Sequence, residues 1–154
     1  MDVSPITESL YIAANPRADV VESIQQLGVR MVISMIAIRP TRAFFRRPFK
    51  LLILPTADDP RLPIPLFALK YGVKRALPVI EQGDGVLVYC REGRHRSVAM
   101  AACILIGLGY TADDAMALIT AKREVADPHA PHIEKQIRKY ERWREEHRRK
   151  ENST

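Results

Sequence analysis

The stretch from Val86 to Ser97 constrains the fold more than any other part of this sequence. Four apolar residues, 86–89, lead directly into Cys90, and a short polar loop with one glycine follows. An apolar run without proline then extends over residues 98–108. This order predicts a buried strand, a tight turn and a buried helix. Such a loop directs successive backbone N–H groups and the positive end of a helix toward one point, which predicts an anion-binding site.

Cys90 lies at the centre of this predicted anion site. Backbone N–H groups and nearby cations favour a thiolate, so the pKa of this cysteine should be lowered. A thiolate beside a bound phosphate is placed to attack phosphorus and form a phosphocysteine. Arg96 offers a planar fork that holds two phosphate oxygens and stabilises the transition state, which a lysine would not match. Ser97 can donate its hydroxyl to the sulfur, which makes the thiolate a better leaving group in the second step.

The specificity of this motif depends on more than its cysteine and arginine. Arginine is abundant in this chain, so the Cys-x5-Arg spacing by itself is a weak signal. The additional features are Gly93 inside the loop, Ser97 at its end, a strand before it and an apolar helix after it. Together they favour a phosphate loop over a buried cysteine in a basic turn.

The rest of the chain alternates between strand and helix patterns. The predicted strands cover residues 10–14, 31–38, 50–54 and 86–90; the predicted helices cover residues 18–27, 67–80 and 96–108, a segment after Thr111, and residues 131–148. The first of these strands is expected at the edge of the sheet. This alternation indicates an α/β domain with a mostly parallel central sheet flanked by helices. The loop after Cys90 would then lie at the carboxyl edge of the sheet, where ligands usually bind.

Residues 90–97 resemble the Cys-x-x-Gly-x-x-Arg-Ser/Thr phosphate loop of the cysteine-based dual-specificity protein phosphatases. The resemblance extends over most of the chain, through residues 10–13, 27–33 and 54–60. It implies a protein-tyrosine-phosphatase-like fold and a hydrolase that needs no cofactor, similar to the compact atypical members of that family. One departure is Tyr89, because the family usually has a histidine directly before the cysteine.

A phosphatase of this kind also needs a general acid. The leaving oxygen takes a proton, and a carboxylic acid on a mobile loop can supply it. The register with the family motif points to Asp58 for this role. Asp59 is adjacent and is an alternative, and either aspartate can equally be a turn residue. Asp127 is a further alternative, because low-molecular-weight tyrosine phosphatases use an Asp-Pro pair after the cysteine; their cysteine, however, lies near the N-terminus.

The residues between the nucleophile and Arg96 are predicted to bind the substrate. They are Arg91, Glu92, Gly93, Arg94 and His95. Their backbone N–H groups should face the phosphate while their side chains point to the rim. Arg94 and His95 add positive charge there, which resembles the loop of atypical phosphatases that act on inositol pyrophosphates, whereas Glu92 removes one unit of charge. The alternative interpretation is that Arg94 and His95 simply face solvent.

Length and composition indicate how many domains to expect and which locations are compatible with the chain. A chain of 154 residues is sufficient for one domain, which we expect at residues 1–148, followed by a basic and polar tail at 149–154. No segment is long and apolar enough to predict a membrane span. Of the two cysteines, Cys103 is predicted to be a small core residue, with a disulfide to Cys90 as the alternative; this cysteine usage favours a reducing, cytoplasmic location.

His129 and His132 flank Pro131 and invite a metal interpretation. A metal site needs three or four ligands with ordered spacing, and the sequence offers none, so no metal is expected. The net charge of +6 favours polyanionic partners, but no motif supports nucleic-acid binding, and the oligomeric state stays open.

The sequence therefore predicts a phosphatase that hydrolyses phosphotyrosine and aryl phosphate monoesters through a phosphocysteine, with phosphoserine and phosphothreonine as further substrates. The alternative is a phosphatase of a non-protein polyanion: a phosphoinositide, an inositol polyphosphate or pyrophosphate, or an RNA 5′-phosphate. A non-catalytic phosphate-binding adaptor is the third interpretation, against which the intact Cys90 and Arg96 argue.

Overall fold

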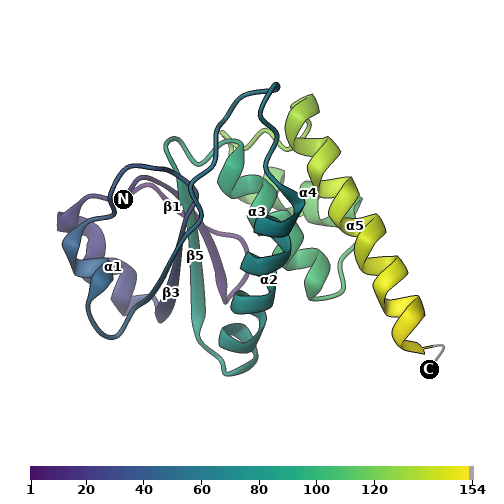
Figure 1. Ribbon diagram of the computed structural model, residues 1–154. Helices are drawn as coiled ribbons and strands as arrows, with labels where there is room; N and C mark the ends of the chain where they lie inside the picture. Colours follow the sequence, from purple (N-terminus) through teal and green to yellow (C-terminus); the bar gives the residue numbers. More distant parts are fainter. Residues whose placement is uncertain (153–154) are drawn as a thin grey trace.

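Five strands form a single sheet in the computed structural model, which describes residues 1–152 (Figure 1). The strands are β1 (Val3–Pro5), β2 (Leu10–Ala14), β3 (Val29–Ser34), β4 (Lys50–Ile53) and β5 (Gly85–Cys90). Their order across the sheet is β1-β2-β5-β3-β4. Only the β1–β2 pair is antiparallel, and the other neighbours run parallel. The predicted α/β class with a mostly parallel sheet is confirmed.

Helices cover both faces of this sheet (Figure 1). They are α1 (Val21–Gln26), α2 (Leu66–Glu81), α3 (Arg96–Gly107), α4 (Ala112–Lys122) and α5 (Pro131–Asn152), with 3-10 turns at Ala18–Val20 and Arg42–Phe45. Helix α1 lies on one face and contacts β3, whereas α2 and α3 lie on the other face against β5, with α4 and α5 outside them.

The centre of the molecule is built by β5 and α3. Every residue of β5 is buried, and so is every residue of α3 from Ser97 to Ile106. A strand in a parallel sheet is covered on both faces, which explains its continuous apolar run. A helix that is apolar all round has to be enclosed by other elements, and α3 contacts α2, α4 and α5 as well as the sheet. The loop that carries Cys90 therefore joins the two most enclosed elements of the fold.

The edge of the sheet differs from the prediction. The sequence analysis missed β1, which is three residues long and ends in Pro5. A segment this short, with a proline, has no readable alternation of apolar and polar residues. Because β1 pairs with β2, the strand at Leu10–Ala14 is not an edge strand, and the prediction was wrong there.

The boundaries of strand β3 also differ from the predicted 31–38. It begins at Val29 and ends at Ser34, although Met35 and Ile36 are still buried. The main-chain carbonyl of Met35 accepts a hydrogen bond from the Thr56 hydroxyl at 2.8 Å. The apolar run continues because the chain remains in the core after it has left the sheet, so burial does not mark the end of this strand.

Helix α5 is longer than the predicted 131–148. It continues to Asn152, so residues 149–152 of the expected tail are helical, and residues 153–154 lie outside the described residues. Lysine, arginine and glutamate are good helix formers, and a pair such as His147 and Glu151, 3.2 Å apart one turn away, supports the last turns. Within residues 1–152, no helix has the length and apolar character needed to cross a membrane.

Candidate active site

The loop after β5 forms as predicted, with Cys90 as the last residue of the strand and Arg96 as the first of α3. Gly93 has a φ of +65°, in the left-handed region that favours glycine. A Cβ atom here would also lie 2.8 Å from the carbonyl oxygen of Ala13 in β2. The loop thus needs glycine at this position both for its backbone angle and for its close approach to the sheet.

Cys90 lies at the floor of the loop, with only 3% of its surface exposed. Its Sγ is 3.1 Å from the hydroxyl oxygen of Ser97. Burial raises the pKa of the Cys90 thiol, but hydrogen bonds from the Ser97 hydroxyl and from the backbone N–H groups of Ser97, Gly93 and Arg94 outweigh it, so the pKa is lowered overall. The environment therefore favours a thiolate, as the sequence predicted.

Arg123 supports the loop from behind, and the sequence analysis missed this role. The side chain is 2% exposed; its Nε donates to the carbonyl of Gly93 at 2.7 Å and its Nη2 to the carbonyl of Glu92 at 3.1 Å. It also pairs with Asp2, 2.9 Å away. By holding these carbonyls on the far side, Arg123 leaves the loop N–H groups turned toward the pocket. In the sequence it is simply one of many basic residues near the C-terminal end.

Arg96 connects the loop to the neighbouring segment. Its Nη1 donates to the main-chain carbonyl of Thr56 at 2.7 Å. Its Nε is buried and has no hydrogen-bond partner among residues 1–152. A buried guanidinium N–H without a partner is costly, and a phosphate oxygen in the pocket is the kind of acceptor that would satisfy it.

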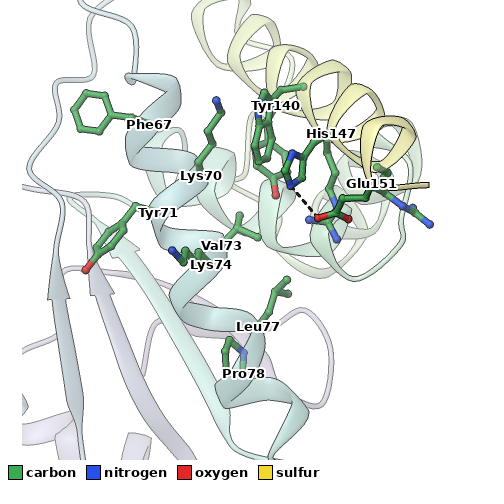
Figure 2. A pocket seen from close by; sticks show the side chains of 13 residues that line it. Phe67, Lys70, Tyr71, Val73, Lys74, Leu77, Pro78, Tyr140, His147 and Glu151 are labelled. Atoms are coloured by element: carbon green, nitrogen blue, oxygen red, sulfur yellow. Dashed lines mark ion pairs between the residues drawn. The ribbon is translucent and has the colours of Figure 1, made fainter. Parts of the chain in front are cut away.

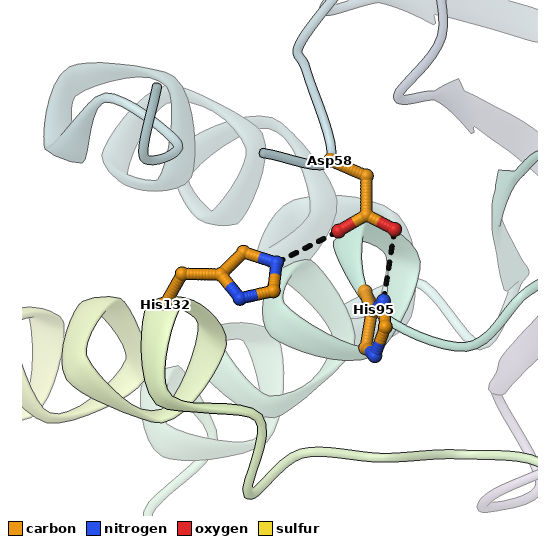
Figure 3. Close-up of side chains that lie close together, drawn as sticks. All are labelled: Asp58, His95 and His132. Carbon is orange, nitrogen blue, oxygen red and sulfur yellow. Dashed lines mark hydrogen bonds and ion pairs between the residues drawn. The ribbon is translucent and has the colours of Figure 1, made fainter. Parts of the chain in front are cut away.

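Asp58 is held by two histidines from distant parts of the chain (Figure 3). Nδ1 of His95 and Nε2 of His132 each lie 2.8 Å from one of its carboxylate oxygens. Partial burial raises the pKa of Asp58. The hydrogen bonds and charges of these histidines lower the pKa by more, so it is lowered overall. Within residues 1–152, the three side chains also form a group that could hold a metal ion. The spacing of His132 in the sequence gave no sign of this contact.

The other two aspartates considered as general acids have different surroundings. Asp59 accepts a hydrogen bond from the backbone N–H of Arg61 at 2.9 Å and pairs with its side chain, as a turn residue would. Asp127 lies behind His95, with its carboxylate 3.3 Å from Nε2 of that ring and 3.8 Å from Arg94. Of the three aspartates, only Asp58 lines the pocket that contains Cys90.

That pocket has a volume of about 320 Å³ and a mainly charged lining: Asp58, Cys90, Arg91, Glu92, Arg94, His95 and Arg96. Arg91, Glu92 and Arg94 are exposed, Gly93 is buried, and His95 is partly buried between two carboxylates. The loop residues that the sequence assigned to substrate binding thus surround the nucleophile, but His95 does not simply face solvent.

Two further residues discussed in the sequence analysis, Tyr89 and Cys103, do not line the pocket. Tyr89 is fully buried beside Phe44, with their ring centroids 6.2 Å apart. Cys103 is buried inside α3, and both cysteines are free thiols, so the predicted disulfide alternative is not the one observed. Burial raises the pKa of Cys103.

A larger groove, of about 690 Å³, lies between α2 and α5 (Figure 2). It is mostly apolar with a basic rim, and Lys70 lies 4.2 Å from the ring centroid of Trp143 across it. Its lining contains no cysteine and no residue of the Cys90 loop. The smaller pocket, and not this groove, therefore holds the candidate reaction chemistry.

The sheet order, the Cys90 loop and its surrounding helices define the protein-tyrosine-phosphatase-like fold of the dual-specificity phosphatases. Human DUSP28 has this fold with a TM-score of 0.84, at 24% sequence identity over 94% of this chain and 99% of that one. PTPMT1 has it with a TM-score of 0.85, at 22% identity over 96% and 99%; PTPMT1 is also solved in complex with PI(5)P, with a TM-score of 0.81. These likenesses confirm the fold implied by the sequence resemblance.

One curated relative matches in sequence. It is "Putative tyrosine phosphatase 123R" of Invertebrate iridescent virus 6, 38% identical over 65 residues. The match covers 42% of this chain and 45% of the viral protein, so it spans less than half of either. No protein-family model matches the chain.

Proposed function

We propose that this protein is a cysteine-dependent phosphatase that hydrolyses phosphate monoesters through a phosphocysteine. The observation that carries this proposal is the Cys90 thiol, 3.1 Å from Ser97, at the floor of a pocket that also presents Arg96 and Asp58. A nucleophile, an anion-binding fork and a carboxylic acid converge there from separate elements. The name of the viral relative and that of a structural neighbour from mouse, "putative dual specificity phosphatase", support the same conclusion.

In the proposed first step, Cys90 Sγ attacks phosphorus while the bond to the leaving oxygen breaks. Arg96 and the loop N–H groups hold the phosphate oxygens as charge develops on them. Asp58 gives a proton to the leaving oxygen; because its pKa is lowered, the protonated form is the minor one at neutral pH, and acidic pH should favour this step. In the second step the Asp58 carboxylate takes a proton from water, which attacks phosphorus. The Ser97 hydroxyl stabilises the departing Cys90 thiolate.

Phosphotyrosine and aryl phosphates are the proposed substrates, with phosphoserine and phosphothreonine as further ones. The viral relative, described as a tyrosine phosphatase, supports this choice. A non-protein polyanion is the second candidate: a phosphoinositide, an inositol polyphosphate or an RNA 5′-phosphate. Arg91 and Arg94 on the rim favour it, as does the PI(5)P bound to PTPMT1. A non-catalytic adaptor is less well supported, because Cys90 and Arg96 are both in place.

We also propose that residues 1–148 form a catalytic domain, from which the last turn of α5 extends, and that the protein acts in the cytoplasm. The two free thiols, one of them the nucleophile, are consistent with a reducing compartment.

The experiment that tests this function is phosphate release from a panel of substrates at fixed ionic strength. The panel holds p-nitrophenyl phosphate, phosphotyrosine and phosphothreonine peptides, a phosphoinositide, an inositol pyrophosphate and RNA 5′-triphosphate. Wild type should release phosphate and Cys90→Ser should not; Cys103→Ala, which removes the other thiol, is the matched control and should stay active. Equal release by wild type and Cys90→Ser would overturn the mechanism. Tight phosphopeptide binding without release would indicate the adaptor.

A further inference from the structure

Three side chains from distant segments converge at the rim of the Cys90 pocket (Figure 3). Asp58 lies between β4 and α2, His95 in the loop before α3, and His132 in the first turn of α5. One ligand atom from each, a carboxylate oxygen of Asp58, Nδ1 of His95 and Nε2 of His132, lies within 4.8 Å of the others. We propose that Asp58, His95 and His132 bind Zn²⁺, and that the bound ion inhibits the enzyme by occupying its general acid.

The spacing of the ligand atoms suits this ion. With Zn–N and Zn–O bonds of about 2.0–2.2 Å, tetrahedral ligands lie roughly 3.4 Å apart. The two contacts to Asp58, each 2.8 Å, would have to open by about half an ångström, and the two histidine nitrogens, no more than 4.8 Å apart, would have to adjust to the same spacing. Asp58 lies on a loop segment outside the helices and strands, where such a shift needs no rearrangement of the core.

The ligand set selects the class of metal. Two imidazoles and one carboxylate are a ligand set of zinc sites, in which the fourth position stays open to water or substrate. Calcium and magnesium prefer oxygen ligands throughout and would gain little from two imidazoles. Within residues 1–152, the ion-pair partners of Asp58 are these two histidines alone, so no arginine or lysine already occupies its carboxylate.

A further carboxylate orients one of the ligands. The second ring nitrogen of His95, Nε2, lies 3.3 Å from Asp127. When the ion binds, Nδ1 gives up the proton that it shares with Asp58, and an N–H kept on Nε2 toward Asp127 leaves Nδ1 as the lone pair, the arrangement that metal-bound histidines commonly have. Asp127 therefore directs Nδ1 of His95 toward Asp58, where the ion would lie.

The inhibition follows from the role of Asp58, and this half of the inference rests on the proposed function. A carboxylate oxygen that coordinates Zn²⁺ carries no proton, so Asp58 cannot protonate the leaving oxygen. A leaving group such as p-nitrophenolate needs little protonation, whereas the phenolate of tyrosine needs much more. Zn²⁺ at this site should consequently inhibit hydrolysis of a phosphotyrosine peptide more strongly than hydrolysis of p-nitrophenyl phosphate.

Metal binding is tested without catalysis, by calorimetric titration of Zn²⁺ into the metal-free Cys90→Ser protein. One ion should bind, and the visible absorption bands of Co²⁺ added in its place should report nitrogen and oxygen ligands. In the same background, His132→Ala and Asp58→Asn should each lower the affinity at least tenfold. His129→Ala removes an exposed histidine outside the cluster and should bind as before. Affinity unchanged in both ligand variants, or binding that requires Cys90, would overturn the site.

The inhibition is tested on wild type with both substrates. At saturating Zn²⁺ the fraction of activity lost should be larger with the phosphotyrosine peptide than with p-nitrophenyl phosphate, and Asp58→Asn should remove the difference between the substrates. Equal inhibition of both reactions in wild type would indicate that the ion acts on the thiol and would overturn the inhibitory role. If neither substrate is hydrolysed, the proposed function fails, and the calorimetric result still decides the metal site.

Discussion

At the scale of single residues, the Cys90 loop depends on a partner that lies behind it. The guanidinium of Arg123 binds the carbonyls of Glu92 and Gly93, and a charged group buried to this extent is retained only where it is fully paired. These bonds face away from the pocket, so Arg123 acts as a positioning residue and does not touch the substrate.

Replacing Arg123 should therefore impair the reaction without removing any reacting group. Arg123→Met leaves two loop carbonyls unpaired, and displacement of the loop by about 1 Å should lower kcat on the order of 10²-fold. Arg123→Lys keeps the charge but loses the fork and should fall between wild type and the methionine variant. Steady-state kinetics with p-nitrophenyl phosphate measures this order. A kcat unchanged in Arg123→Met would show that the loop holds its shape alone.

The lowered pKa of Cys90 leads to a second residue-scale prediction. The thiolate should persist at pH values below the usual pKa of a thiol, because the hydrogen bonds of Ser97 and the loop favour it. Ser97→Ala removes one of them, so the pKa should rise and the pH profile of iodoacetamide alkylation should shift toward higher pH. Cys103, fully buried and with a raised pKa, should not react in the folded protein. Identical profiles for wild type and Ser97→Ala would contradict this account.

At the scale of the elements, the segment between β4 and α2 carries the general acid to the pocket. Arg96 binds the carbonyl of Thr56, and Gln136 of α5 donates to the carbonyl of Ile64 at 2.6 Å. The segment is thus attached to α3 near one end and to α5 near the other, with Asp58 between these attachments.

Because of this arrangement, substitution of each of the three candidate acids should have a different effect on activity. Asp58→Asn should lower kcat about 10²- to 10⁴-fold for a phosphotyrosine peptide and less for p-nitrophenyl phosphate. The kcat of Asp59→Asn should stay close to that of wild type, because the Asp59 carboxylate is engaged in a local turn with the backbone N–H of Arg61. Asp127→Asn should have an intermediate effect through His95. If Asp59→Asn shows the large loss, the register taken from the family resemblance is wrong by one residue.

The close packing of α2 on α3 leaves no room for a side chain at Gly72 of α2. A Cβ atom at Gly72 would overlap the end of the Met100 side chain, which is fully buried. Gly72→Ala should destabilise the protein by about 1–3 kcal/mol through overpacking, despite the better helix propensity of alanine. Chemical denaturation measures the change, and Gly83→Ala, with open space around it but a φ of +88°, separates overpacking from backbone strain. A Gly72→Ala protein as stable as wild type would show that Met100 can move aside.

The elements also explain how far the sequence predicts this site. Cys90, Arg96 and Ser97 lie within one strand–loop–helix unit, so local pattern alone placed them together. Asp58 required the family resemblance, because nothing local relates it to position 90. Arg123 and His132 reach the site through contacts between distant segments, and neither belongs to a pattern of spacing. The same holds for the end of β3, which depends on where its neighbours stop.

At the scale of the whole molecule, a ligand bound in the Cys90 pocket should stabilise the folded protein. Vanadate mimics the five-coordinate phosphoryl transition state, and a ligand that binds only the folded protein raises its melting temperature with concentration. Wild type should therefore melt at a higher temperature as vanadate is added, and activity should fall in parallel. Cys90→Ser, which lacks the sulfur that bonds to vanadium, should gain much less. A melting temperature that does not respond to vanadate in wild type would contradict the predicted pocket.

The attachment of Arg123 also has a consequence for the order in which a ribosome makes this chain. A domain generally folds as a unit. The strand, the loop and the nucleophile leave the ribosome before the arginine that holds the loop carbonyls, which comes only after α4, and His132 follows later still. A nascent chain that already carries Cys90 is thus expected to be inert, and the reactive thiolate arises only when most of the domain has been completed.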